Sequence, residues 1–503
     1  MSDDGGLARH TSISVLWMTA QRWVTRLGGF VTIIILTRIL APEDFGIAAT
    51  ATTLLPLIYV LADAGFSAYL VQAREVDERT LATAFWFSLV SGMALAGVIA
   101  AAAPFISSAL DVPEAAPLLQ VMGLSVLAVA VGSVPMALLR RAMEFRKLAL
   151  LEANAAIIAQ IVAITVAVTG GGAWALVLQV LCGQVTVLVS VWIVARWRPH
   201  PGFSFARFKV MVAFGTNVVG SGLVYALRVW AETAIVVAGL GVREMGFLSI
   251  AQRLVQTAQD LSISALLPVS MAAFAKIRDS VDRLRGFYLR ASAVAYAVIT
   301  PLMVFLAVAA PEVVELLFGA DKADSALVVP ALAIMAIAGV GWAVDQALLV
   351  GTGHPGRWFA FIAVIYSIAL LVSLYLVQFG LLAIVTGWAV IAIVETLLRS
   401  IPVAPVIGAT KWQVIAPFVS VVPTAVLAGA AGWGVLWLAD PLPLVIEIFL
   451  GGMAVVVTYL AGMALLKPAT TATVLSVLPG RIARPARAVM GRRIRVVDDA
   501  PGA

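Results

Sequence analysis

Two arginines stand deep inside long apolar runs of this chain, where a charge is rare. Arg26 lies fourteen residues before Leu40, and Arg228 lies eleven residues before Gly239. If these runs are membrane-crossing helices, the two positions are roughly 21 and 16 Å from the outer ends, in a hydrocarbon core about 30 Å thick. A charge there costs about 2.5–3.5 kcal/mol and usually faces the protein interior or a wet cavity. Because a guanidinium is permanently charged and bonds bidentately, both positions predict an anion-binding site.

Each of these arginines has a charged neighbour one helical turn away, and this neighbour leaves its role open. Glu232 follows Arg228 by four residues, so the two either form an ion pair within the helix or make a cationic site that Glu232 gates. Arg22 precedes Arg26 by four residues and either joins the same site or extends to the inner headgroups. The spacing supports both alternatives at each position.

A further polar group lies on one predicted helix near residue 256. Arg253 and Gln256 share a helix face, and Asp260 lies one turn beyond Gln256. A polar stripe on an otherwise apolar helix is expected to face the lumen of the protein. We expect Asp260 to pair with an arginine; the alternative is that it binds a proton or Na⁺.

Other charged residues fall near the inner ends of the predicted helices. We expect them to set the topology and to form salt bridges between the lobes at the cytoplasmic mouth. Such bridges either hold the structure or gate it by forming in one state and breaking in another. The residues concerned are Asp63, Glu152, Asp345, Glu395 and Arg399.

The composition explains which elements must position these side chains. Hydrophobic residues make up 62% of the 503 residues, charged residues 12%, and the mean hydropathy is +1.04. Soluble domains carry about 25% charged residues, so this chain has too little polar surface to cover a globule of its size. The apolar runs are about twenty residues long without alternation, which favours helices over a barrel. We therefore predict an all-α polytopic membrane protein.

The apolar runs predict about fourteen transmembrane helices, the first of them a retained helix rather than a signal peptide. With both termini on one side, 25 of the 33 lysines and arginines lie in segments on that side, and only Arg38, Arg243 and Lys322 lie on the other. This excess predicts a bacterial cytoplasmic (inner) membrane protein with both termini in the cytoplasm. The predicted spans are 13–40, 45–70, 80–104, 115–138, 149–169, 173–195, 210–238, 246–270, 287–310, 326–350, 357–378, 381–400, 414–438 and 442–466.

A weak internal repeat relates two halves of the chain. The segment Leu40–Gly46, followed by Ala51, has a counterpart 200 residues later in Leu240–Gly246, followed by Ala251. Two parallel six-helix lobes around a central cavity are typical of transporters. The predicted organisation is an N-terminal lobe at 1–204, a C-terminal lobe at 205–410, two additional helices at 411–467 and a basic cytoplasmic tail at 468–503.

Several motifs that other functions require are missing. The chain has three histidines and one cysteine, Cys182, so we expect no metal site and no cofactor. It has no Walker motif, nucleotide fingerprint or nucleophile elbow. The longest predicted outer loop, near Pro311 to Asp324, is too short for the catalytic domain of a membrane glycosyltransferase or ligase. We expect the basic tail to bind anionic lipid or a synthesis partner, and we expect no nucleic-acid partner.

Several segments together resemble one family in their order and spacing, over about residues 11 to 410. This sequence is similar to the Wzx-type polysaccharide exporters, which are lipid-linked oligosaccharide flippases of the multidrug/oligosaccharidyl-lipid/polysaccharide superfamily. Two departures stand out: Glu232 replaces a frequent aspartate, and the stretch Gln256–Asp260 lacks a common proline. The segments that carry the resemblance are Thr37–Gly46, Asp63–Gln72, Phe85–Phe87, Pro135–Ala149, Gly246–Leu254, Arg278–Arg285, Pro301–Met303 and Ala310–Glu312.

The resemblance implies transport rather than catalysis. It implies that an undecaprenyl-diphosphate-linked glycan crosses from the inner to the outer leaflet by alternating access, with Arg26, Arg228 and Arg22 as ligands of the diphosphate. Membrane lipids, a polysaccharide polymerase or glycosyltransferases would be its partners. An ion-coupled drug or metabolite antiporter with Asp260 or Glu232 as the coupling residue, a lipid II-type flippase and a membrane enzyme remain as alternatives.

Overall fold

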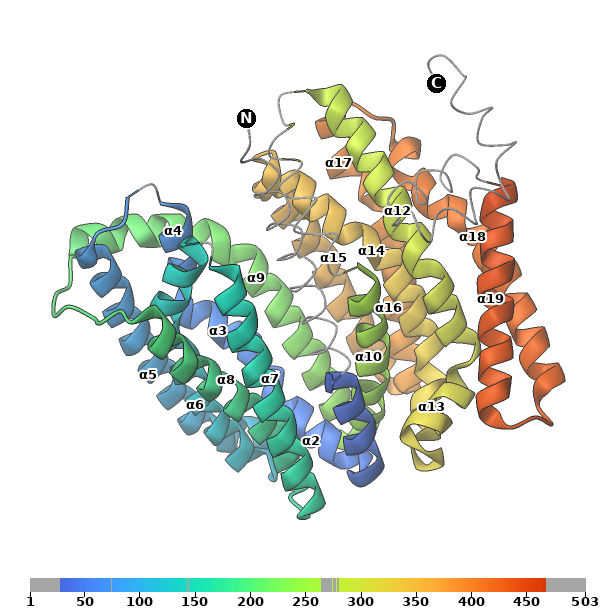
Figure 1. The fold of residues 1–503 in the computed structure, drawn as a ribbon, viewed down its shortest axis with the longest axis horizontal. Helices are drawn as coiled ribbons and strands as arrows, with labels where there is room; N and C mark the ends of the chain where they lie inside the picture. The colour runs from blue at the N-terminus through green and yellow to red at the C-terminus, as the bar shows by residue number, and fades with distance from the viewer. Residues whose placement is uncertain are drawn as a thin grey trace, which may run out of the picture. The chain divides into compact units, whose positions relative to one another are not determined.

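The computed structural model describes residues 28–73, 75–142, 144–263, 274, 277 and 280–466. Every regular element in this part of the chain is a helix (Figure 1). Twelve of these helices are long and apolar enough to cross a membrane. The chain divides into two compact units, Met1–Ile250 and Ala251–Ala503.

The first unit is built from helix pairs. Helix α5 packs along α6, and α7 packs along α8. Helix α5 begins after Asp77, whose side chain accepts a hydrogen bond from the Thr80 amide as an N-cap. The helices are Gly28–Ile39, α2 (Pro42–Thr52), α3 (Leu55–Asp63), α4 (Phe66–Gln72), α5 (Glu78–Ala109), α6 (Ala115–Arg141), α7 (Phe145–Val168), α8 (Trp174–Ala195), α9 (Phe205–Leu240) and the start of α10 (Val242–Ile263).

The prediction of one continuous helix over 45–70 is wrong. Ala64 and Gly65 have φ angles of 48° and 76°, in the left-handed region that ends a helix. The backbone here lies against α9: a Cβ atom on Gly65 would lie 2.9 Å from the Cα atom of Gly215. The chain is therefore divided into α3 and α4 at a point where two glycines permit close backbone contact.

The two copies of the internal repeat contact each other reciprocally inside the first unit. A Cβ atom on Gly46 would lie 1.8 Å from the carbonyl oxygen of Val242, and one on Gly246 would lie 1.8 Å from that of Pro42. Gly46 thus packs on Val242, and Gly246 packs on Pro42. The two glycines are 200 positions apart, and so are the two residues that they contact. Such a reciprocal contact is what repeats related by a pseudo-two-fold axis produce.

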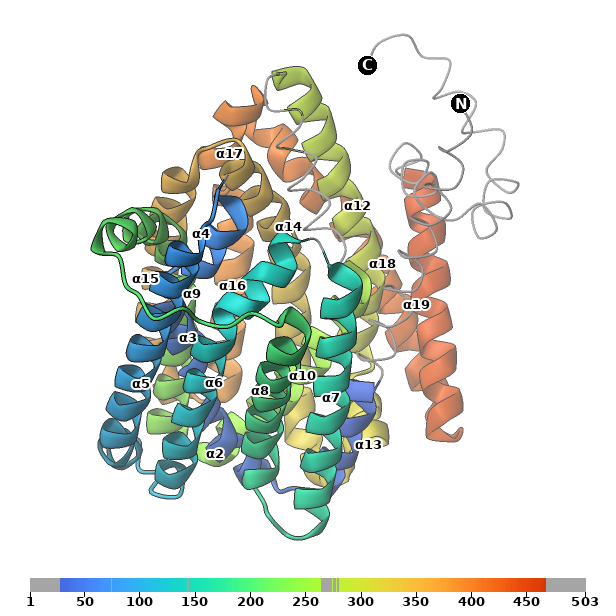
Figure 2. The same ribbon diagram turned by 60° about the vertical axis from the view of Figure 1, so that its left-hand side comes forward.

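The second unit holds the remaining helices. Helices α18 and α19 form a hairpin, and α18 packs against α12 (Figure 2). The segment predicted as an outer loop at 311–324 is folded as α13 followed by a 3₁₀ helix. The elements are α12 (Val281–Val308), α13 (Ala310–Phe318), η1 (Ala320–Val328), α14 (Val329–Gly351), α15 (Pro355–Leu376), η2 (Val377–Phe379), α16 (Leu381–Leu398), α17 (Ser400–Ile407), α18 (Lys411–Ala439) and α19 (Leu444–Leu466).

The all-helical polytopic fold agrees with the sequence prediction, and its twelve candidate spans are close to the expected fourteen. The other two predicted spans are 13–40, described only from Gly28, and 246–270, described as α10 as far as Ile263. Helix α10 does not qualify as an apolar span, and it carries four charged residues, Arg243, Glu244, Arg253 and Asp260.

Candidate functional site

The first unit contains a buried ion pair within α9. The Nε atom of Arg228 donates to Oε1 of Glu232 over 2.7 Å, one helical turn along. The two side chains are 19% and 11% exposed. Most of the surface of both side chains is therefore buried, but a part of each stays exposed, which distinguishes the pair from ions in a fully packed core.

The arginines predicted to complete this site, Arg22 and Arg26, lie outside the described residues. The predicted polar stripe of α10 is present on the described helix. Arg253 is half-buried, while Gln256 and Asp260 are exposed one turn apart on the same face. Of the predicted site residues, the structure thus brings Arg228 and Glu232 into direct contact and places Gln256 and Asp260 on a common face.

Asp63 lies at the break between α3 and α4 and connects the two helices. Its Oδ1 atom accepts hydrogen bonds from the Ser67 amide over 3.3 Å and from the Ser67 hydroxyl over 2.5 Å. Arg141 binds the other end of α4 by donating to the carbonyl oxygens of Leu70 and Ala73. Both charged residues therefore stabilise the short helix at this break.

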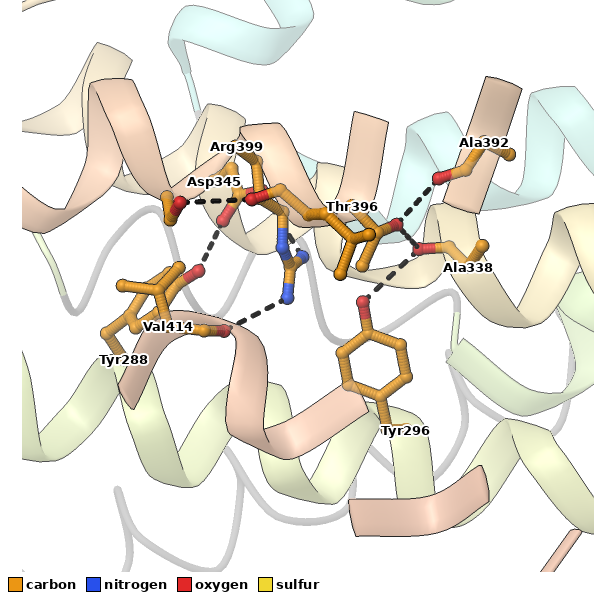
Figure 3. A network of polar contacts seen from close by, with 10 residues as sticks. Tyr288, Tyr296, Ala338, Asp345, Ala392, Thr396, Arg399 and Val414 are labelled. Carbon is orange, nitrogen blue, oxygen red and sulfur yellow. Dashed lines mark hydrogen bonds and ion pairs between the residues drawn. The ribbon is translucent and has the colours of Figure 1, made fainter. Parts of the chain in front are cut away.

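A second ion pair, between Asp345 and Arg399, lies in the second unit and is fully buried (Figure 3). Arg399, at the junction of α16 and α17, donates from Nη1 to Oδ2 of Asp345 on α14 over 3.3 Å. The Tyr288 hydroxyl on α12 donates to the other carboxylate oxygen over 2.6 Å. Both oxygens of Asp345 are thus satisfied by side chains from other helices of the same unit, whereas the sequence led us to expect salt bridges between lobes.

Further contacts surround the Arg399 guanidinium and extend this network to α18. Its Nη2 atom lies 3.5 Å from the carbonyl oxygen of Val414, and its central carbon lies 5.4 Å from the centre of the Tyr296 ring. Tyr296 and Thr396 both donate to the carbonyl oxygen of Ala338, over 3.2 and 2.8 Å. The network therefore fastens α12, α14, the α16–α17 junction and α18 to one another.

Gly341 provides the space that the guanidinium occupies. A Cβ atom at this position would lie 1.3 Å from Nη1 of Arg399 and 2.7 Å from the Tyr296 hydroxyl. No side chain fits there without displacing the arginine. The position of the Arg399 side chain therefore requires a glycine at position 341.

Sequence reasoning identified Asp345 and Arg399 but missed Tyr288, Tyr296, Thr396 and Gly341. The two tyrosines are eight residues apart, about two turns of one helix face. This spacing was a usable signal, because a buried tyrosine hydroxyl needs a hydrogen-bond partner. The role of Gly341 had no such signal, since it depends on which helix packs against it.

Comparison with known proteins now gives the family. Residues 35–326, more than half of the chain, match a family model described as "Polysaccharide biosynthesis protein". The chain belongs to this family. The predicted kinship with polysaccharide exporters is thereby confirmed.

Two relatives extend the match. The succinoglycan biosynthesis transport protein ExoT of Rhizobium meliloti (strain 1021) is 27% identical over 317 residues, 63% of this chain. The lipopolysaccharide biosynthesis protein WzxC of Escherichia coli (strain K12) is 24% identical over 422 residues, which are 80% of this chain and 84% of that protein. The match spans 64% of the length of ExoT, just under two thirds.

Solved structures share the fold. The lipid II flippase MurJ, in an inward closed conformation, aligns with a TM-score of 0.73 at 13% identity and covers 90% of this chain and 98% of MurJ. An inward-facing multidrug resistance MATE family transporter aligns with a TM-score of 0.59 at 18% identity and covers 76% of this chain and 95% of that one. The protein thus has the multi-pass helical fold of transporters of the multidrug/oligosaccharidyl-lipid/polysaccharide superfamily.

Proposed function

We propose that this protein is a flippase that moves a polyprenyl-diphosphate-linked oligosaccharide, a precursor of surface polysaccharide, across the cytoplasmic membrane by alternating access. Family membership and the two relatives, named for succinoglycan and lipopolysaccharide biosynthesis, support the substrate class. The fold that it shares with a lipid II flippase supports the reaction. The observation that carries the proposal furthest is the partly open Arg228–Glu232 pair inside an apolar helix.

The Arg228–Glu232 pair suits reversible binding of an anionic ligand. Alone, it is neutral overall, so the empty site does not hold an isolated charge in a membrane span. A diphosphate offers oxygens that bind a guanidinium bidentately and compete with the carboxylate of Glu232. When the substrate leaves, Glu232 takes its place, which limits the affinity and permits release. Arg22 and Arg26 complete the cationic site in this proposal, and the polyprenyl chain stays in lipid.

The orientation follows from charge placement. We propose that both termini lie in the cytoplasm of a bacterial cell, because basic residues are concentrated in the segments on that side. The substrate is then loaded from the cytoplasmic leaflet, where lipid-linked glycans are assembled. Glycosyltransferases that build the glycan and a polymerase that consumes it are the proposed partners. Transport is driven by an ion gradient, by the membrane potential or by consumption of the product.

An ion-coupled antiporter is the second candidate, supported by two acidic side chains and one likeness. Glu232 is a buried carboxylate in a span, Asp260 is an exposed one on α10, and the MATE transporter shares the fold. In that case the carboxylates would bind the coupling ion and Arg228 would modulate them. The glycan flippase is preferred because the relatives are named for polysaccharide and lipopolysaccharide biosynthesis.

Reconstitution separates the two candidates. Purified protein is placed in liposomes that contain a fluorescent polyprenyl-diphosphate-linked glycan, and a glycosidase added outside reports which glycans are accessible. A flippase exposes the whole pool, whereas protein-free liposomes expose only the outer leaflet. If the glycan in the inner leaflet stays protected while a cation gradient drives export of a small cationic drug, the antiporter replaces the flippase.

A further inference from the structure

An extended stretch and the first turns of α9 form a strap at one end of the first unit. We define the strap as residues 196–213. Its first nine residues run from the end of α8 across the unit to the start of α9 (Figure 2). In the proposed orientation this end is cytoplasmic.

Hydrogen bonds and an ion pair fix the strap to α5. The Trp86 ring nitrogen donates to the carbonyl oxygen of His200 over 3.1 Å, and the Ser204 amide donates to the hydroxyl of Thr83 over 3.0 Å. The Trp197 ring nitrogen lies 3.3 Å from a carboxylate oxygen of Glu78, and Arg207 pairs with Asp77. The strap is thus fixed to α5 at several points between Trp197 and Arg207.

The exposed side chains of the strap, which we call its free face, are basic and aromatic. Arg196, Arg198 and Lys209 are exposed, and Phe203 and Phe205 are 52% and 62% exposed. Residues 196–213 contain no aspartate or glutamate. The face therefore combines positive charge with apolar rings and carries no acidic side chain of its own.

The exposed rings are held in place by a chain of aromatic contacts that leads to the buried Phe66. Phe203 and Phe205 lie 5.7 and 5.9 Å, between ring centres, from Phe208. Phe208 in turn contacts Phe66 and Phe87 at 5.9 and 5.1 Å, in the core of the unit. Holding large apolar rings in an exposed position is unfavourable in water, so this arrangement indicates an apolar environment at the strap.

The first turns of α9 are amphipathic in the manner of an interfacial helix. Met211 is buried, and Arg207 and Phe208 are half-buried against the unit, while Lys209 and Val210 face outward. A segment with apolar and basic residues on its free face, at the start of α9, suits the boundary between headgroups and acyl chains.

We propose that the strap is a binding surface for anionic phospholipid. The headgroup phosphates bind Arg196, Arg198 and Lys209, and Phe203, Phe205 and Val210 insert at the acyl boundary. Charge complementarity selects this occupant, because the basic side chains suit the negative cytoplasmic leaflet and the rings suit its apolar edge. This surface anchors the start of α9, the helix that carries Arg228, and it stands independently of the transported substrate.

Native mass spectrometry of the full-length protein, released from nanodiscs that mix phosphatidylglycerol with phosphatidylcholine, tests the proposal. The wild type is expected to retain phosphatidylglycerol preferentially. The triple variant Arg196→Gln, Arg198→Gln and Lys209→Gln should lose this preference, by roughly fivefold for each charge removed. The matched control Arg79→Gln, Arg146→Gln and Arg357→Gln removes three other exposed positive charges and should keep it. Equal loss in both variants, or no loss in the strap variant, overturns the proposal.

A depth measurement distinguishes lipid from a protein occupant. A nitroxide attached at Val210→Cys, in a Cys182→Ala background, should report immersion at the headgroup–acyl boundary of the nanodisc. The same measurement on the triple strap variant in zwitterionic lipid separates the rings from the charges. If the nitroxide stays at the boundary there, the rings hold the strap in the membrane without the basic side chains. A fully aqueous nitroxide in the wild type, or one buried by a second copy of the chain, contradicts lipid binding at the strap.

Discussion

The two units each contain an arginine–carboxylate pair, and the pairs differ in almost every other respect. Arg228 and Glu232 lie on one helix and keep a fraction of their side chains exposed. Asp345 and Arg399 come from different helices, are fully buried, and are surrounded by Tyr288, Tyr296 and a backbone carbonyl. The same two functional groups are therefore partly exposed in one case and fully enclosed by other helices in the other.

The physical reason is desolvation. Removing each ion from water costs several kcal/mol even after relaxation, and a buried pair is tolerated only with good geometry and additional hydrogen bonds. The Asp345–Arg399 network has those bonds from several helices, so breaking it disrupts packing. The Arg228–Glu232 pair joins two residues of one helix and keeps part of both side chains exposed. The Asp345–Arg399 pair is therefore suited to structure, and in our proposal the Arg228–Glu232 pair serves ligand exchange.

The largest expected effect is that of Arg399→Leu. This change leaves the Asp345 carboxylate buried without its cation, which costs about 3–5 kcal/mol. The melting temperature in detergent should fall steeply, and Arg228→Leu should lower it less, because Glu232 keeps 11% of its side chain exposed. The double variant Asp345→Leu with Arg399→Leu should recover part of the loss. A single variant as stable as the wild type would remove the distinction between the pairs.

Gly341→Ala tests the same network without removing a charge. Its Cβ atom would occupy the position of the Arg399 guanidinium, so we expect a loss of about 1–3 kcal/mol from overpacking. Gly339→Ala on the same helix is the matched control, since a Cβ there meets nothing within 4 Å. Thermal unfolding of the two variants should differ clearly; equal melting temperatures would mean that the guanidinium moves aside at little cost.

Arg228→Ala should separate stability from transport. We expect a folded protein whose apparent affinity for the lipid-linked glycan falls roughly ten- to a hundredfold, as the loss of charged hydrogen bonds worth about 1.5–3 kcal/mol implies. Arg228→Lys keeps the charge but loses bidentate bonding, so it should recover only part of the activity. The liposome accessibility assay measures both variants, and full activity of the alanine variant would remove Arg228 from the site.

Glu232→Gln should have a smaller effect of opposite sign on binding. Removing the competing carboxylate leaves Arg228 with a net positive charge, so substrate binding should strengthen several-fold while turnover slows. Binding and rate are measured on the same liposomes. Weaker binding in this variant would mean that Glu232 positions Arg228 rather than competing with the substrate.

The Asp77–Arg207 pair extends the comparison to exposed side chains and should show the smallest effect. Hydrogen bonds from Thr80, together with the Arg207 guanidinium, hold the pKa of Asp77 below its ordinary value. A lowered pKa in the folded state adds stability that is present at neutral pH and is lost as the pH falls below about 3.9 and through the lowered value. Asp77→Asn should therefore melt slightly below the wild type at pH 7 and equally at pH 2. A difference that persists in acid would assign it to packing.

The sequence allowed prediction of those features that depend on local order. Apolar run length predicted the helices, the four-residue spacing of Arg228 and Glu232 allowed for an ion pair, and the repeat at 40–46 and 240–246 corresponds to segments that contact each other. The break at Ala64 and Gly65 was missed, because an alanine with positive φ is imposed by packing on Gly215. The choice of Arg399 as partner of Asp345, and the need for glycine at 341, depend on helix packing that no single segment encodes.

The most direct test of the account is the sidedness of lipid-linked glycans in cells depleted of this protein. The cells are complemented with the wild type, with Arg228→Ala or with the control Arg357→Ala, all at equal expression. We predict that a diphosphate-linked intermediate accumulates in the inner leaflet on depletion. The wild type and the control should clear it, whereas Arg228→Ala should not. Clearance by Arg228→Ala, or intact surface polysaccharide without accumulation in cells that lack a second flippase, would contradict the account.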